Sequence, residues 1–149
     1  MQSEIGISLY SSENVIAGTE WLMPSTIFLT FSANNILSYD QYVDSFISDY
    51  TDIINRLKAN IPYARIYVQG ILPCDPAFVD EYPYYHYRDE YNARLEEMCN
   101  DLGVNYFDVS FILEAHPDIY SDDGIHPRWP FYPLWLTYMA EISGLAEVK

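Results

Sequence analysis

Basic residues are scarce in this sequence. Its 149 residues include 7 lysines and arginines against 22 aspartates and glutamates, which gives a formal net charge of −15. Such a charge repels nucleic acids and anionic membrane surfaces, because both are negatively charged themselves. We therefore expect neither nucleic acid nor membrane as a partner, and we expect a neutral or cationic ligand instead.

Long apolar runs are lacking as well. No stretch of the sequence approaches the roughly 20 apolar residues that a membrane-spanning helix needs. The first four residues, Met1 to Glu4, have neither the basic nor the apolar region of a signal peptide. This favours a cytoplasmic protein, unless a signal was removed upstream of the given sequence, in which case a secreted protein stays open.

Cysteine and histidine are rare. Cys74 and Cys99 have neither the spacing of a metal site nor that of a redox pair, although a disulfide between them stays open. The three histidines show no HxH or HExxH spacing, so a metal site that combines Asp122, Asp123 and His126 is disfavoured. We expect no metal and no cofactor.

The sequence does contain enough apolar surface for one core. Half of its residues are hydrophobic and 17% are aromatic, a composition typical of globular rather than disordered proteins. A chain of this length can bury a core without disulfides, and it shows no repeats, linkers or low-complexity tracts. We therefore interpret residues 1–149 as a single domain.

Apolar patterns predict strands that alternate with helices. Short apolar runs predict three strands, at residues 26–31, 64–72 and 104–109. Helical spacing predicts three helices, at residues 38–60, 89–102 and 133–142. The tyrosine-rich segment 74–88 is interpreted as a long loop. This order indicates an α/β fold with a parallel sheet, in which ligands bind beyond the carboxyl ends of the strands.

The clearest chemistry lies in residues 122–127, DDGIHP, between the third predicted strand and the last helix. Asp123 stands three residues before His126, around Gly124. On a rigid turn this spacing puts a carboxylate beside an imidazole, which fixes the ring tautomer and stabilises its protonated form. The pair is therefore a candidate general base for a hydroxyl nucleophile. The alternative is a surface turn with an incidental histidine. Asp122 is expected to face solvent.

The segment DGIHP at 123–127 resembles the last block of the SGNH, or GDSL-type, serine hydrolases, where an Asp and a His complete a catalytic triad. The segment TFSANN at 30–35 resembles the family block Gly-x-Asn-Asp, whose first Asn donates to the oxyanion. Asn34 keeps that Asn, while Ser32 replaces the Gly and Asn35 the Asp. The resemblance extends from about Ala17 to Leu145. An Asx-turn is the alternative role for Asn34.

This resemblance implies a three-layer α/β/α, flavodoxin-like fold with a parallel sheet. It also implies an esterase or lipase-like activity. The family hydrolyses acyl esters, acylated carbohydrates among them, without a cofactor. In this reaction Asp123 would orient His126, and Asn34 would donate to the oxyanion. Gly18 resembles the second oxyanion block and is a further candidate donor. An acidic surface suits a neutral, small acylated substrate such as an acylated carbohydrate.

The family's first block, Gly-Asp-Ser, ends the central strand and supplies the nucleophile. The nearest match is Gly6-Ile7-Ser8-Leu9, with Ile in place of Asp, so Ser8 is the candidate nucleophile. Only five residues precede Gly6, barely enough for a strand, and 26 positions separate Ser8 from Asn34, too few for the usual intervening elements. The alternative places Ser8 in a short edge strand or loop.

A sheet that lacks its first strand would leave the neighbouring strands with unpaired backbone groups, each costing about 1–3 kcal/mol. Three explanations stay open: the sequence is N-terminally incomplete, residues 4–10 substitute for the strand, or a homo-oligomer completes the sheet. The degenerate first block also leaves open a different function, a non-catalytic SGNH-like binding or interaction module that has lost its nucleophile.

Aromatic residues gather near the candidate site. The tyrosine run at 82–87, together with Trp129 and Trp135, could form a platform on which sugar rings stack. Tyrosines also half-bury at lids and dimer interfaces, because their rings pack while their hydroxyls stay hydrated. The sequence favours neither interpretation over the other.

Overall fold

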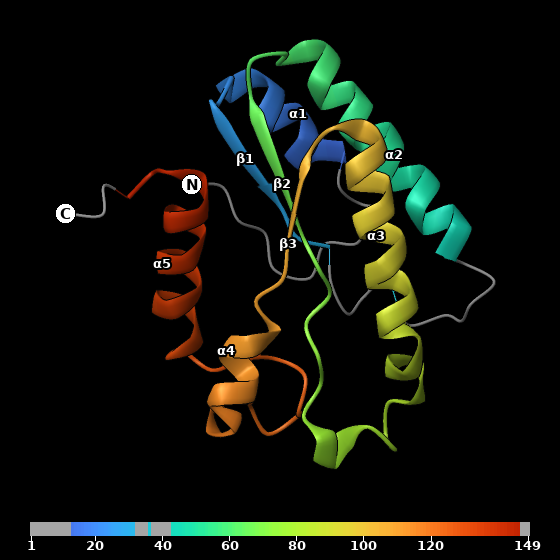
Figure 1. The fold of residues 1–149 in the computed structure, drawn as a ribbon, viewed down its shortest axis with the longest axis vertical. Helices are drawn as coiled ribbons and strands as arrows, with labels where there is room; N and C mark the ends of the chain where they lie inside the picture. Colours follow the sequence, from blue (N-terminus) through green and yellow to red (C-terminus); the bar gives the residue numbers. More distant parts are fainter. Residues whose placement is uncertain (1–12, 32–35, 37–42, 147–149) are drawn as a thin grey trace.

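The protein is a mixed α/β domain around a parallel sheet (Figure 1). Its structure, a computed structural model, describes residues 13–31, 36 and 43–146. The sheet has the order β1-β2-β3, formed by β1 (Thr26–Leu29), β2 (Arg65–Gln69) and β3 (Asn105–Phe107). Both pairings are parallel. The predicted fold class is confirmed, and all three predicted strands are present, each shorter than its apolar run.

The described residues form five α-helices: α1 (Glu13–Leu22), α2 (Val43–Asn60), α3 (Arg88–Leu102), α4 (Ser110–Ala115) and α5 (Phe131–Ser143). Helices α2, α3 and α5 match the three predicted ones, although the predicted start of α2 at residue 38 lies outside the described residues. The sequence did not predict α1 or α4. Helix α1 buries only Ile16, and α4 is six residues long, so neither has a readable apolar stripe.

The predicted loop 74–88 is not free of regular structure. It holds two short 3₁₀ helices, η4 (Pro76–Phe78) and η5 (Pro83–Tyr87), each of which begins at a proline. A third, η6 (Pro117–Ile119), follows α4. Proline favours such starts because its fixed φ suits the first helical position and its missing N–H would have no partner there.

Side chains alternate between the two faces of the sheet and thereby define three layers. Ile66 and Val68 of β2 belong to a core with residues of α1, α2 and α3, whereas Tyr67 faces a second core with residues of α4 and α5. Figure 1 shows α2 and α3 on one side of the sheet and α5 on the other. This is the three-layer α/β/α arrangement that the resemblance implied.

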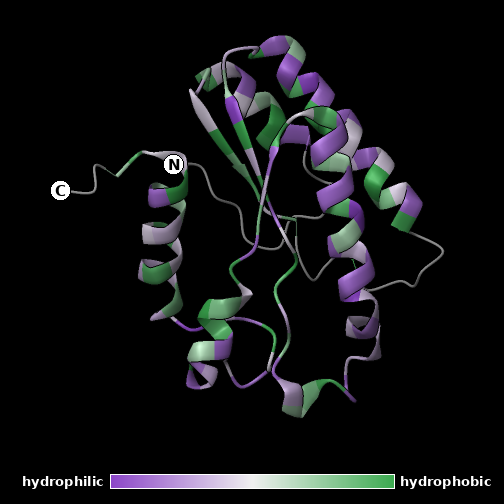
Figure 2. Ribbon diagram, viewed as in Figure 1, coloured by the Kyte–Doolittle hydropathy of each residue, from purple (hydrophilic) through white to green (hydrophobic). Residues whose placement is uncertain are grey.

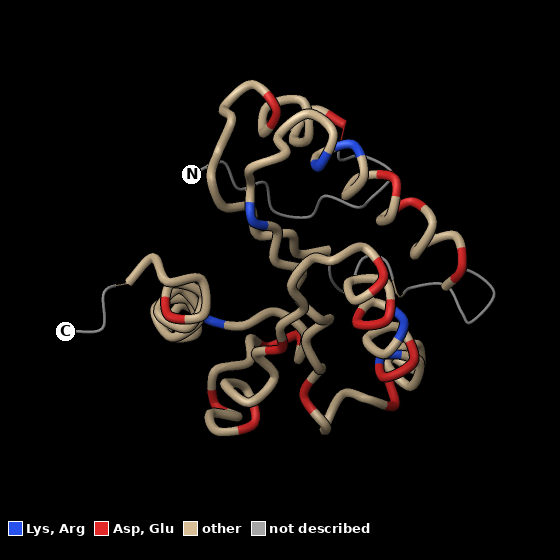
Figure 3. The backbone as a smooth tube through the Cα atoms, turned by 45° about the horizontal axis from the view of Figure 1, so that its top comes forward, with Lys and Arg blue, Asp and Glu red and all other residues tan. Residues whose placement is uncertain are grey.

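The helices that cover the sheet are amphipathic, and hydrophilic and hydrophobic residues alternate along α2 and α3 (Figure 2). Helix α3 ends at Leu102, as predicted, and Gly103 follows it with a φ of 65°, the left-handed cap that glycine adopts most readily. Acidic positions outnumber basic ones on both helical layers (Figure 3). No helix among the described residues is long and apolar enough to span a bilayer.

Within the described residues, β1 pairs with β2 alone. The segment 4–10, which is the candidate for a substituting strand, lies outside these residues. A fourth strand beside β1, from this chain or from a second copy, therefore stays a prediction. Cys74 and Cys99 are both free and buried, so the disulfide that the sequence left open does not form here.

Candidate active site

The candidate site is a closed turn between η6 and α5. Tyr120 forms an isolated antiparallel bridge with Pro127, and the backbone N–H of Ser121 donates to the carbonyl of His126 (2.8 Å). The N–H of Arg128 donates to the Ile119 carbonyl (2.6 Å) on the same two segments. These bonds join the two ends of the turn, so the residues between them are held in one conformation.

Gly124 sits at the tip of this turn, with φ at +67°. A Cβ at this position would lie 2.4 Å from Cγ of Phe78, so the turn needs glycine for its backbone angle and for the close approach of the ring. The N–H of Asp75 donates to the Gly124 carbonyl (2.7 Å), and the Tyr120 hydroxyl donates to the Pro73 carbonyl (3.1 Å). The turn is thereby anchored to the loop that follows β2, beyond the carboxyl end of the sheet.

The carboxylate of Asp123 is fully engaged within the turn. Its Oδ1 accepts hydrogen bonds from the Ser121 hydroxyl (2.6 Å) and from the backbone N–H groups of Ile125 (2.9 Å) and His126 (3.0 Å). Its Oδ2 lies 2.6 Å from Nδ1 of His126. The predicted pairing of carboxylate and imidazole is thus present, and three further donors fix the carboxylate in place.

These hydrogen bonds hold the pKa of Asp123 well below its usual value. The largest contribution is the Ser121 hydroxyl, and the bonds from His126 and Ile125 add to it, while partial burial opposes them. A carboxylate at Oδ2 favours the tautomer in which Nδ1 carries the hydrogen, and Nε2 is then left as the acceptor. The His126 side chain is 68% exposed, so a substrate can reach this nitrogen.

The lowered pKa of Asp123 predicts a pH-dependent contribution to folding stability. The carboxylate stabilises the folded state fully above its unfolded pKa of about 4, and this contribution is lost as the pH falls towards the lower folded-state pKa. We expect Asp123→Asn to lower the urea midpoint at pH 7, and the difference from the parent protein to shrink steadily below pH about 4.

Asp122→Asn is the matched control, because the Asp122 side chain is 97% exposed. Urea unfolding at several pH values measures both variants. A difference between Asp123→Asn and the parent that does not change with pH would contradict the interpretation.

A second polar network holds the segment that follows β2, and it was not predicted from the sequence. The Arg88 side chain donates to the Ile71 carbonyl (2.7 Å) and to the Ser110 hydroxyl (2.5 Å), and Ser110 in turn donates to Asp108 (2.6 Å). The Asn92 side chain binds both backbone groups of Ile71, at 2.7 and 3.1 Å. These side chains join α3 and α4 to the same sheet edge as the candidate site. Arg88 and Asn92 share one face of α3, but nothing in the sequence shows which carbonyl they reach.

The other predicted site residues are placed as follows. Ser8 and Asn34 lie outside the described residues. Gly18 lies inside α1, where backbone N–H groups donate to carbonyls one turn earlier, and this placement disfavours it as an oxyanion donor. Asp122 is exposed, as expected, and pairs with Arg128. No group of three or more potential metal ligands occurs within the described ranges.

The aromatic platform is smaller than the sequence suggested. Tyr82, Tyr84 and Tyr85 pack on one another, with ring centroids 5.2 to 6.5 Å apart, and also against the core of the α3 side. Trp135 is half-buried, and its ring N–H donates to Gln69 (2.6 Å). These rings pack within the chain, so they do not form the exposed platform that was one of the two interpretations. Trp129 differs from them because its side chain reaches solvent.

The described residues thus combine a parallel α/β sheet with a carboxylate–imidazole pair beyond its strand ends. Comparison with known proteins identifies the family. The model of the GDSL-like Lipase/Acylhydrolase family matches residues 5–132, and the chain belongs to this family. No curated protein matches the sequence of this chain.

Solved structures share the fold. A GDSL-like lipase from Bacteroides thetaiotaomicron aligns with a TM-score of 0.73 at 16% identity, over 95% of this chain and 73% of the other. An acetyl-xylooligosaccharide esterase from Geobacillus stearothermophilus aligns at 0.73 and 15% identity, over 97% and 71%. A carbohydrate esterase family 3 protein from Talaromyces cellulolyticus aligns at 0.69 and 20% identity, over 95% and 70%.

Proposed function

We propose that this protein hydrolyses acyl esters, with acylated carbohydrates as substrates, by a Ser–His–Asp mechanism. The observation that carries the proposal is the 2.6 Å contact between Nδ1 of His126 and Oδ2 of Asp123, in a turn that also holds the other carboxylate oxygen. Family membership supports ester hydrolysis in general. The names of two similar structures, an acetyl-xylooligosaccharide esterase and a carbohydrate esterase, support the substrate class.

In the proposed reaction the Ser8 hydroxyl attacks the ester carbonyl, and Nε2 of His126 takes its proton. The Asn34 side-chain amide donates to the oxyanion of the tetrahedral intermediate. The intermediate collapses as His126 returns the proton to the leaving alcohol, which leaves an acyl-enzyme. Water, deprotonated by His126, then attacks the acyl group, and the second tetrahedral intermediate collapses as His126 returns this proton to the Ser8 oxygen, which releases the acid. Asp123 keeps the ring oriented and stabilises its protonated form throughout.

Ser8 is proposed as the nucleophile because the family match begins at residue 5 and therefore includes the Gly6-Ile7-Ser8-Leu9 stretch. The test uses p-nitrophenyl acetate turnover together with covalent labelling by a fluorophosphonate, followed by peptide mass spectrometry. We expect one labelled peptide, containing Ser8, and loss of both labelling and turnover in Ser8→Ala. Ser45→Ala, which changes an exposed serine on α2, is the matched control.

Two outcomes would contradict this assignment. Turnover that survives Ser8→Ala would show that another group is the nucleophile. Absence of both turnover and labelling in the unaltered chain would favour the non-catalytic binding module instead. The Ile at position 7, where the family block has Asp, is the feature that supports this alternative.

A further inference from the structure

Trp129 is the most exposed aromatic side chain close in sequence to the candidate base. Trp129 is 77% exposed and lies three positions after His126. Water solvates a large apolar ring poorly, so a surface tryptophan beside a reactive group is typical of a binding site. Its backbone is fixed, because the Arg128 N–H bonds to Ile119 and the Tyr132 N–H bonds to the Trp129 carbonyl (3.1 Å).

A stack of aromatic rings supports Trp129 from behind. Its ring centroid lies 6.1 Å from that of Tyr132, with the two planes inclined by 42°. Tyr132 packs edge-on against Phe131 and Trp135, whose rings stack on each other at 6.0 Å. Trp135 is held in turn by the buried Gln69 at the end of β2. Trp129 and Tyr132 are thereby part of a rigid assembly of rings that reaches the sheet.

Trp129 and Tyr132 follow the candidate base closely in the sequence. Three peptide units separate Trp129 from His126, so their Cα atoms lie at most about 11 Å apart. Arg128, which precedes Trp129 in the sequence, pairs with Asp122, and both side chains are more than half exposed. An exposed aromatic ring and exposed hydrogen-bonding groups therefore occur within a few residues of His126.

We infer that Trp129 and Tyr132 form a subsite that stacks against a sugar ring in the alcohol portion of the substrate. This inference rests on the proposed function and names where its carbohydrate binds. The C–H face of a pyranose is apolar and weakly positive, and it complements the negative face of an aromatic ring. Its hydroxyls point outward from the ring edge, where Asp122 and Arg128 can bond to them.

A long acyl chain suits this surface less well. An alkyl chain is stabilised in proportion to the apolar area that it loses to burial, and apolar ligands accordingly occupy concave, enclosed sites. One exposed indole with a tilted phenol beside it covers a single side of a ligand. The net charge of −15 likewise disfavours an anionic ligand and leaves a neutral sugar acceptable.

The first test is kinetic. We expect Trp129→Ala to lower the ratio of kcat/KM for acetylated xylotetraose to kcat/KM for ethyl acetate by about tenfold, mainly through KM. Ethyl acetate is chosen because it carries neither a sugar nor an aromatic ring. Trp129→Phe should restore most of the ratio, because a phenyl ring can still stack.

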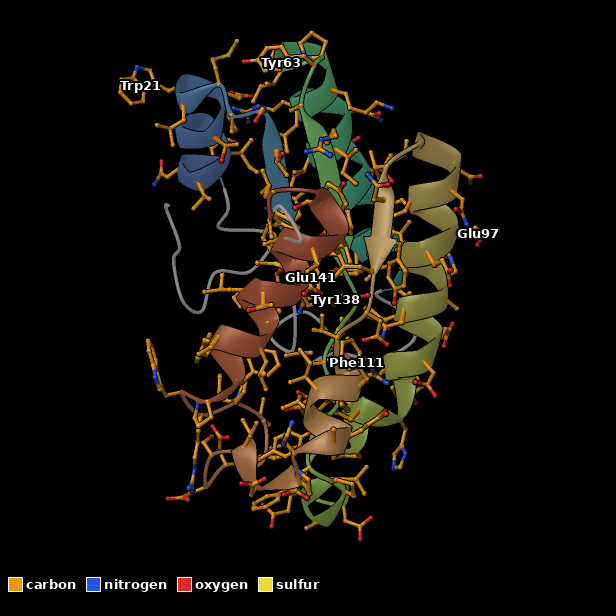
Figure 4. All side chains as sticks on the ribbon, turned by 60° about the vertical axis from the view of Figure 1, so that its left-hand side comes forward. Trp21, Tyr63, Glu97, Phe111, Tyr138 and Glu141 are labelled. Carbon is orange, nitrogen blue, oxygen red and sulfur yellow. The ribbon has the colours of Figure 1, made fainter. Side chains whose placement is uncertain are left out.

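The chain offers a matched control in Trp21, which is 82% exposed. It extends outward from the end of α1, beside the amino end of β1 and away from the strand ends that carry the candidate site (Figure 4). Trp21→Ala removes an equally exposed indole, so we expect it to leave the ratio unchanged. An equal ratio in Trp129→Ala and Trp21→Ala, with turnover intact, would overturn the subsite while leaving the proposed function in place.

The second test does not depend on catalysis. Xylotetraose without acetyl groups is titrated into the full chain by isothermal titration calorimetry, with circular dichroism to verify that each variant is folded. We expect binding by the unaltered chain and by Trp21→Ala, and about tenfold weaker binding by Trp129→Ala. Such binding in a protein without turnover would retain the subsite and reject the esterase. Xylotetraose binding that is undetectable or equal in all three proteins would overturn the subsite.

Discussion

Replacing His126 with alanine is expected to lower kcat/KM for p-nitrophenyl acetate by about four to six orders of magnitude, the range that loss of a triad member costs in serine hydrolases. Without the imidazole, no group paired with Asp123 in this turn can take the proton of the nucleophile. Asp123→Asn is expected to cost about four orders of magnitude, because its amide can donate to Nδ1 and favour the tautomer in which Nε2 carries the hydrogen. Steady-state kinetics at pH 7 to 8 measure both effects.

The chain supplies its own controls for this experiment. His86 belongs to η5 and His116 ends α4, and neither contacts the Asp123–His126 pair through a described hydrogen bond. Alanine at either position should leave kcat/KM within about twofold of the parent, the range typical of surface changes away from a site. Thermal unfolding of each variant separates loss of the base from loss of the fold. Activity retained in a folded His126→Ala protein would exclude His126 as the general base.

The carboxylate–imidazole pair could be predicted from the sequence because its geometry is local. Asp123 and His126 are three residues apart, and a turn bracketed by paired segments leaves few ways to arrange them. The same locality explains why the end of α3 at Leu102 was correctly predicted. Apolar runs also located all three strands, since a buried parallel strand is apolar on both faces.

What the sequence did not predict depends on contacts between distant residues. Arg88 and Ser110 are 22 positions apart, and their hydrogen bond exists only because α3 and α4 meet at the ends of β2 and β3. The fate of the aromatic residues was undecided for the same reason. Trp135 binds Gln69, 66 positions away, whereas Trp129 in the neighbouring turn has no such partner among the described hydrogen bonds. Tertiary packing, which no local pattern encodes, separates the structural ring from the exposed one.

Gly124→Ala is expected to cause the largest loss of stability of any change proposed for this chain, about 2–4 kcal/mol of unfolding free energy. Two costs combine at this position. The φ of +67° is strained for alanine, and the new methyl group would lie 2.4 Å from Cγ and 2.9 Å from Cβ of Phe78. Because Cβ of Phe78 is itself too close, rotating the phenyl ring does not relieve the overlap. Urea unfolding at pH 7 measures the loss.

Gly103→Ala separates these two costs. Gly103 has a nearly identical φ of +65°, but no atom lies within 4 Å of the position its Cβ would take. Its replacement should cost about 1 kcal/mol, the strain alone. Phe78→Ala combined with Gly124→Ala should then lose less than the sum of the single changes, since the ring that meets the methyl group is gone. If Gly124→Ala cost no more than Gly103→Ala, the loop after β2 would not be packed against the turn that holds Asp123 and His126. The anchoring of Asp123 and His126 to the sheet edge through Phe78 would then be wrong.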